Sequence, residues 1–100
     1  MTAATLTPDG ATLKVAGVLD FETVVELLAQ GREWIETAAP AQFTIDLAGV
    51  EYSSSAGLAL LLEWLRVAER GQKRATLAGM PADMQALVRV GGLEPALLAA

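Results

Sequence analysis

Three consecutive serines, Ser53–Ser55, are the side chains of this chain best placed to do chemistry. They follow an alternating apolar segment, Phe43–Leu47, and precede a small Ala-Gly pair and the apolar run Ala56–Leu62. This order predicts a strand, a loop and the first turn of a helix, where backbone N–H groups are free. We expect one serine to cap that helix. The free N–H groups could also hold an anion, but no glycine-rich loop with a lysine accompanies them, so we expect no nucleotide site.

Two carboxylates, Asp20 and Asp46, lie at the ends of predicted strands. Paired carboxylates can perform acid–base catalysis. The chain has no histidine and no cysteine to join them as base, nucleophile or metal ligand. We therefore expect Asp20 to cap the following helix, with Thr23 as an alternative cap, and Asp46 to serve in a turn. No catalytic residue, metal site or cofactor is predicted.

Composition limits the classes of partner. The net charge is −5, and the seven basic residues are scattered, with only Lys73 and Arg74 adjacent, which argues against binding nucleic acid or anionic lipid. The longest apolar run, Ala56–Leu62, is far shorter than the ~20 residues of a membrane span, and the N-terminus shows no signal-peptide pattern. We expect one cytoplasmic domain over residues 1–100. Its 53% apolar content and mean hydropathy of +0.41 hint at a protein partner covering part of the surface.

The elements that position these residues follow from periodicity and turn signals. We predict a hairpin, then two helix–strand pairs, a third helix and a short terminal helix or tail. The expected strands are Ala3–Thr7, Ala11–Gly17, Gln42–Leu47 (ending in a turn at Ala48-Gly49) and Lys73–Leu77; the expected helices are Val24–Thr37, Ala56–Arg70, Asp83–Val90 and Leu93–Leu98. The fold class is α/β (α+β), with a mixed sheet of four to five strands and about four helices packed on it. Trp34 is expected in the core. Trp64 lies beside the buried stripe of its helix; core or semi-buried packing is favoured for it, with partial exposure at an interface as the alternative.

Four motifs in order resemble the STAS family, the sulphate-transporter and anti-sigma-factor-antagonist domains. They are Gly17-Val18-Leu19-Asp20, Ile45-Asp46-Leu47 with Val50, Ser55-Ala56-Gly57-Leu58 and Leu77-Ala78-Gly79, with Val90-Gly91-Gly92-Leu93 closing the pattern. The resemblance covers roughly residues 4–98 and implies a STAS fold. Within the family, the segment Ser55–Leu62 is most similar to the MlaB type, the cytoplasmic STAS subunits of phospholipid ABC transporters of Gram-negative bacteria.

That resemblance implies a non-catalytic subunit that binds the transporter's ATPase subunit (MlaF-like), and through it the permease, and so supports outer-membrane lipid asymmetry. Ser55 stands where MlaB-type domains carry the Ser or Thr implicated in partner binding. We accordingly expect a partner-binding site formed by Ser53, Ser54, Ser55, Ala56, Leu58 and Trp64.

The alternative that the resemblance leaves open is an anti-sigma-factor antagonist switched by serine phosphorylation. In that group the phosphoacceptor serine directly precedes the glycine of the turn. Ala56 occupies that position here and has no hydroxyl, and Ser54 replaces the usual acidic residue. Phosphorylation would therefore require Ser54 or Ser55, which makes constitutive docking the favoured interpretation.

Overall fold

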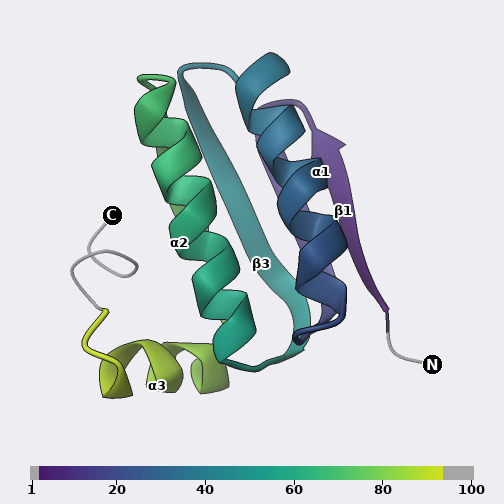
Figure 1. The fold of residues 1–100 in the computed structure, drawn as a ribbon, viewed down its shortest axis with the longest axis vertical. Helices are drawn as coiled ribbons and strands as arrows, with labels where there is room; N and C mark the ends of the chain where they lie inside the picture. Colours follow the sequence, from purple (N-terminus) through teal and green to yellow (C-terminus); the bar gives the residue numbers. More distant parts are fainter. Residues whose placement is uncertain (1–2, 94–100) are drawn as a thin grey trace.

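A computed structural model describes residues 3–93 of the chain (Figure 1). Its elements alternate after an initial pair of strands, as the sequence predicts. In order they are β1 (Ala4–Asp9), β2 (Thr12–Leu19), α1 (Thr23–Thr37), β3 (Gln42–Ser53), α2 (Ser55–Arg70), β4 (Arg74–Ala78) and α3 (Ala82–Val90). The strands form one sheet of order β1-β2-β3-β4.

The sheet is mixed. β1 and β2 form the predicted antiparallel hairpin, with Leu6 opposite Val15 and a tight turn at Gly10, whose φ is +61°. β2–β3 and β3–β4 pair in parallel, because each pair is connected through a helix that crosses back over the sheet. The prediction of a mixed sheet in an α+β fold is confirmed.

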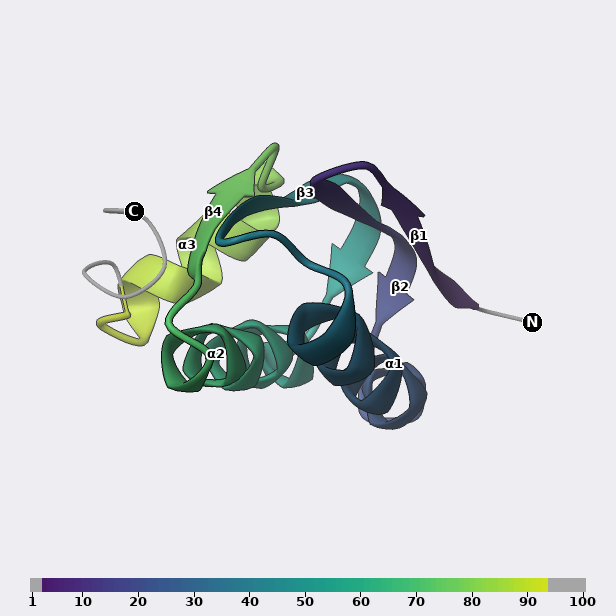
Figure 2. The ribbon, with the colours of Figure 1, turned by 90° about the horizontal axis from the view of Figure 1, so that it is seen from above.

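The helices α1 and α2 lie side by side on one face of the sheet, and they run in the same direction (Figures 1 and 2). The short helix α3 lies beside α2 at the β4 edge, where it contacts β3 and α2. Alternation along the strands explains this two-layer arrangement, because Leu13, Val15 and Ile45 are fully buried under the helices while Lys14 points away from them.

Trp64 lies at the centre of the interface between the two helices and is completely buried. Its indole packs against the backbone of Gly31 on α1, and its Nε1–H donates to the carbonyl of Leu28 at 3.3 Å. A Cβ at position 31 would lie 2.3 Å from the indole ring, so only glycine allows α1 to approach so closely. The favoured expectation of core or semi-buried packing for Trp64 is confirmed, and the alternative of partial exposure at an interface is wrong. Trp34, expected in the core, is half-buried. Its ring packs edge-on against that of Phe43, with 5.3 Å between the two ring centroids.

The third strand is longer than predicted. The pattern at Ala48-Gly49 indicates a turn, but β3 continues through it to Ser53. Pairing with β2 persists because the register shifts twice, at Ala16 opposite Gly49 and at Val18 opposite Tyr52. A side chain at Gly49 would lie 2.9 Å from Cβ of Ala16, so the glycine serves a bulged strand instead of a turn.

The helix count also differs from the prediction of about four, since residues 3–93 contain three. The fourth expected helix, Leu93–Leu98, lies almost wholly outside the described residues. Within α3, Met84 and Val88 face the core, whereas Val90 is 88% exposed because it falls on the opposite side of the helix.

The Gly31–Trp64 contact gives the first testable prediction. Gly31→Ala should destabilise the fold by about 2 kcal/mol, because overpacking against the indole exceeds the ~1 kcal/mol that alanine gains in helix propensity. Urea unfolding followed by circular dichroism measures the change. In a Trp64→Phe background, which removes the ring atoms nearest Gly31, the same substitution should cost much less. Equal costs in the two backgrounds would show that the clash is not the cause.

Candidate partner-binding site

The three serines have three different roles at the start of α2. Ser54 is the N-cap: its backbone is extended (φ −85°, ψ −177°) and its Oγ accepts from the N–H of Ala56 at 3.1 Å. The predicted serine cap is thereby confirmed and assigned to the middle serine. Ser53 is buried, and its hydroxyl donates to the carbonyl of Ser54 at 2.9 Å. Ser55 is the exposed serine of the three.

Gly57 fixes this helix end against the sheet. A Cβ at this position would lie 2.0 Å from Ser53 Oγ and 3.2 Å from Leu19, so the first turn of α2 rests directly on the ends of β2 and β3. The N–H of Ser54 donates to the carbonyl of Leu19 at 2.9 Å, which ties the loop to β2. The position of Ser55 is therefore set by backbone contacts on both sides.

The six predicted partner-binding residues fall into two groups, one accessible to solvent and one buried. Ser55 is exposed and Ser54 is half-buried, so both can contact another protein. The side chains of Ser53, Ala56, Leu58 and Trp64 are buried, at 6%, 4%, 6% and 0% exposure. Trp64 also lies more than two turns along α2 from Ser55, inside the core. The exposed part of the predicted site is thus the loop and first turn of α2, and the buried residues support it from beneath.

Both aspartates accept hydrogen bonds from nearby backbone N–H groups. Asp20 does so at the start of α1, where capping is expected, whereas the turn expected at Asp46 is part of the bulged strand β3. Asp20 Oδ1 accepts from the N–H groups of Glu22 and Thr23, at 2.9 and 3.0 Å, and so caps α1 from two residues before the N-cap position, Glu22. The hydroxyl of Thr23 in turn donates to the carbonyl of Val18 at 2.8 Å. Asp46 Oδ1 accepts from the N–H of Ala48 at 2.9 Å, within the bulged part of β3.

Capping also affects the ionisation of Asp20. The N–H of Thr23, with smaller help from that of Glu22 and against an opposing effect of desolvation, holds the pKa of Asp20 below its ordinary value. The resulting stabilisation is complete above the unfolded pKa of about 3.9 and is lost as the pH falls through the lower folded-state pKa. Asp20 therefore remains an anion beside the site at neutral pH.

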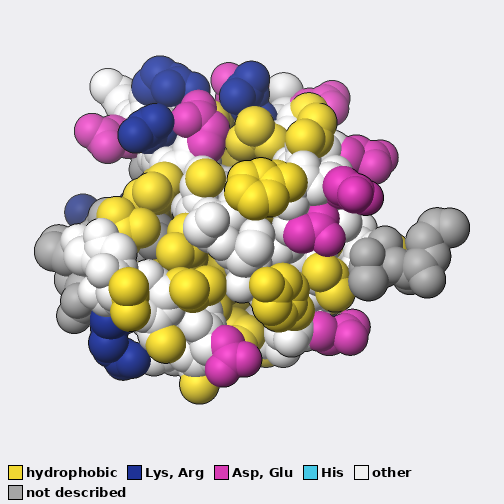
Figure 3. Space-filling model, turned by 60° about the horizontal axis from the view of Figure 1, so that its bottom comes forward, with side chains coloured by type: hydrophobic (Ala, Val, Ile, Leu, Met, Phe, Trp, Pro, Cys, Tyr) yellow, Lys and Arg dark blue, Asp and Glu magenta, His cyan; other side chains and the backbone are white. Residues whose placement is uncertain are grey.

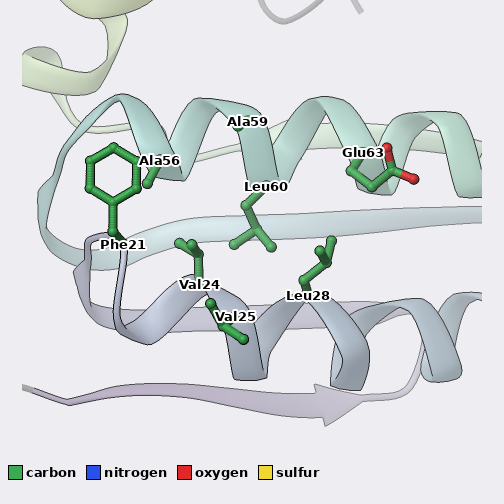
Figure 4. A pocket seen from close by; sticks show the side chains of 8 residues that line it. All are labelled: Phe21, Val24, Val25, Leu28, Ala56, Ala59, Leu60 and Glu63. Carbon is green, nitrogen blue, oxygen red and sulfur yellow. The ribbon is translucent and has the colours of Figure 1, made fainter.

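A groove next to Ser55 contains residues that the sequence patterns did not single out. It lies between α1 and α2, has a volume of about 200 Å³, and is lined by Phe21, Val24, Val25, Leu28, Ala56, Ala59, Leu60 and Glu63 (Figure 4). Phe21 and Val25 are each 71% exposed at its rim. The sequence contains a local indication of this groove: Val25 is an apolar residue off the buried stripe of α1, and Phe21 is an apolar residue in the turn before that helix.

The far end of the groove is charged. Glu63 on α2 pairs with Arg66 at 3.4 Å, with Arg70 at 3.7 Å and with Arg32 of α1 at 3.8 Å. Glu63 is the least exposed member of the group, so it orients the three arginines around one carboxylate. Each ion pair contributes little to stability at such exposure. Together the four side chains make this end of the helix layer charged, in contrast to the apolar groove.

Neither a metal-binding cluster nor a membrane-spanning helix is found in the part of the chain that the structure describes. Across residues 3–93 no three His, Cys, Asp or Glu side chains gather closely enough to hold a metal ion. In the same range no helix combines the length and apolarity needed to cross a bilayer.

The fold and the exposed helix start define a class: a small domain in which helices cover one face of a mixed sheet and the start of α2 is exposed at Ser55. Solved structures of this class are similar to the chain. The unphosphorylated anti-sigma factor antagonist SpoIIAA gives a TM-score of 0.74 at 21% identity, covering 97% of this chain and 87% of that one. An anti-sigma factor antagonist from Mycobacterium paratuberculosis gives 0.72 at 19% identity, covering 98% and 84%.

The phosphorylated form of the Bacillus cell fate determinant SpoIIAA gives a TM-score of 0.69 at 22% identity, covering 97% of this chain and 90% of that one. At these identities the likeness establishes the STAS fold. The family follows from a separate match: the model of the family described as "Mlab, STAS domain" matches residues 2–99. The chain belongs to this family, and the predicted resemblance to MlaB-type STAS domains is confirmed.

The different roles of the serines are testable. Ser54→Ala should lower the free energy of unfolding by about 1 kcal/mol, because the first turn of α2 loses its cap. The matched change Ser55→Ala should stay within about 0.5 kcal/mol of wild type, as is usual for an exposed side chain. Urea midpoints with unchanged m-values measure both. A larger loss for Ser55→Ala than for Ser54→Ala would contradict the assignment of the cap.

Proposed function

We propose that this protein is the STAS subunit of a phospholipid-transporting ABC complex of the Mla type, that it binds the ATPase subunit, and that it supports assembly or activity of the complex. The observation that carries the proposal is the family match over residues 2–99. The ATPase would hold the protein on the cytoplasmic side of the inner membrane, with no insertion of its own, and the complex would help maintain outer-membrane lipid asymmetry.

The contact site proposed for the ATPase is the loop and first turn of α2, centred on Ser55. The loop is exposed at Ser55, and it is held rigidly by the Ser54 cap and the Gly57 contact. A rigid loop loses little conformational entropy on binding, which favours a constitutive contact. The identity of residue 56 also favours constitutive docking, because Ala56 has no hydroxyl to phosphorylate and its side chain is only 4% exposed.

Ser55→Lys should abolish ATPase binding while leaving the domain folded, because it places a long charged side chain at the centre of the contact. Co-purification of the ATPase with the tagged protein, and the Kd of the purified pair, measure the loss. Thr76→Lys, on the exposed side of β4, is the matched control and should bind normally. Normal binding by a folded Ser55→Lys protein would remove this site assignment. Ala56→Arg is unsuitable, since position 56 is buried and the change would test folding instead.

A second candidate is an anti-sigma-factor antagonist switched by phosphorylation. It is favoured by the structural likeness to SpoIIAA, which is known in a phosphorylated form, and by the exposed hydroxyl of Ser55 at a helix N-terminus, where a phosphate is electrostatically favoured. Ser54 is less suited, because its oxygen is occupied by the capping hydrogen bond.

Incubation with the serine kinase of the same cell, followed by intact-mass measurement, separates the two functions. The transporter function predicts no added phosphate on the wild-type chain. An added phosphate that disappears in Ser55→Ala would instead establish the signalling function. Ser54→Ala serves as the control for the neighbouring hydroxyl.

A further inference from the structure

The outer edge of β1 is open to pairing. β1 is an outermost strand of the sheet, with β2 on its inner side, so one row of its backbone groups faces away from the sheet (Figure 2). The N–H of Val18 donates to the carbonyl of Ala3, so the odd-numbered residues of this segment bond to β2. The N–H and C=O groups of Ala4 and Leu6 therefore point outward, with no hydrogen-bond partner within residues 3–93. Such an edge is a template for one more strand.

Pro8 limits how far such pairing can extend. It stands at the next outward-facing position of β1, and as a proline it has no N–H to donate. Proline on an edge strand is a common protection against unwanted pairing. Here it blunts the end of the edge next to the hairpin turn. Ala4 and Leu6 remain able to exchange a donor bond and an acceptor bond each with an added strand.

A hollow of about 250 Å³ lies beside this edge, between β1 and α1. It is lined by Ala3, Ala4, Glu22, Thr23, Glu26, Leu27 and Gln30. The side chains of Ala4 and Leu6 face the helix side of the sheet and pack against the core, whereas those of Thr5 and Thr7 are exposed on the other face. Residues of an added strand that pair with Ala4 and Leu6 would point toward the helix side too. The residue opposite Ala4 would reach the hollow.

The hollow is acidic. Glu22 and Glu26 are exposed, and within residues 3–93 no lysine or arginine forms an ion pair with either carboxylate. The N-terminus of α1 carries about half a positive charge, which opposes them. Asp20 already offsets that charge, because its carboxylate accepts from N–H groups at the start of α1. The two further carboxylates leave a net negative potential on this flank. Figure 3 shows several acidic side chains on its right, the side of β1, and basic ones chiefly at the top and left.

We propose that the β1 edge binds an extended segment of a partner protein as an additional antiparallel strand, with Lys or Arg opposite Ala4 and an apolar residue opposite Leu6. Because an antiparallel strand runs from Leu6 toward Ala4, the segment reads apolar residue, any residue, then Lys or Arg. The cation would lie over Glu22 and Glu26, and the apolar side chain would cover more of the half-buried Leu6. This site is separate from Ser55, and the proposal does not depend on the function proposed above.

A second copy of this chain suits the edge poorly. Pairing of two β1 strands would place Ala4, Leu6 and Pro8 of one copy against the other, and none of these residues carries a positive charge. It would also bring Glu22 and Glu26 of both copies to the same boundary, where like charges repel. The acidic flank therefore favours a cationic segment of another protein.

A hairpin peptide tests the pairing. The probe is a cyclic β-hairpin peptide whose outer strand reads Thr-Leu-Thr-Lys-Thr, and its control carries Glu in place of the Lys. NMR titration of the isotope-labelled chain locates the contact and gives the Kd. We expect shifts at the amides of Ala4 and Leu6, and binding of the Lys peptide about tenfold tighter than that of the Glu peptide at low salt. Equal affinity for the two peptides, or shifts confined to other parts of the chain, would contradict the proposal.

Two sets of variants separate the backbone from the charge. Ala4→Pro removes one outward N–H and leaves the bonds to β2 in place, so it should weaken binding of the Lys peptide about tenfold. Ala4→Val keeps the N–H and is the matched control, so equal affinity of these two proteins would show that β1 does not pair with the peptide. Glu22→Gln with Glu26→Gln should reduce the preference for the Lys peptide to about threefold or less. Glu69→Gln with Asp83→Asn, on α2 and α3, changes the net charge equally and should preserve it.

Photo-crosslinking in the protein's own cells tests the natural occupant. p-Benzoylphenylalanine replaces Thr5, whose exposed side chain lies beside the position of the added strand, and Thr76 on β4, at the other edge of the sheet, is the control. We expect the probe at Thr5, and not at Thr76, to crosslink a segment in which an apolar residue precedes Lys or Arg by two positions. Equal yields at the two positions, a crosslink to a second copy of this chain, or a segment without that pattern would each overturn the proposal.

Discussion

The rest of the structure depends on one close contact, the indole of Trp64 against the backbone of Gly31. It sets how closely α1 and α2 approach, and the two helices together form the layer that covers the sheet. The groove above them exists because the helices meet at this deep contact while their outer surfaces, with Ala56 and Ala59 on one side and Val25 on the other, stay apart. A larger residue at position 31 would separate the helices and alter both the core and the outer surface.

A second glycine extends this constraint to the loop before α2. Gly57 lets the start of α2 rest on Ser53 and Leu19, so the loop has little freedom. Each serine then does what its exposure permits: Ser53 satisfies a buried polar position, Ser54 caps the helix, and Ser55 faces solvent. A three-residue segment thus supplies a packed residue, a helix cap and an exposed hydroxyl.

The family and the geometry agree on a binding module. The chain belongs to the Mlab STAS domain family, a family of generally non-catalytic regulatory proteins, and its polar residues near the helix starts are used as caps. The solved relatives share the fold at about one-fifth sequence identity. Fold similarity therefore does not distinguish a transporter subunit from a signalling switch, and individual residues must do so. Ala56 is the most informative of these, because no phosphate can be placed on it.

Sequence alone determined the order of elements, the hairpin, the mixed sheet, a serine cap and the structural use of Asp20 and Asp46. These depend on local periodicity, turn residues and capping, which act over a few neighbouring positions. Tertiary structure decided the rest. β3 runs through Ala48-Gly49 because β2 is available to pair with a shifted register. Trp64 is buried because α1 offers a glycine opposite it, 33 positions earlier in the chain. The groove at Phe21 and Val25 forms between two helices that are distant in sequence. A local sequence pattern therefore cannot predict it.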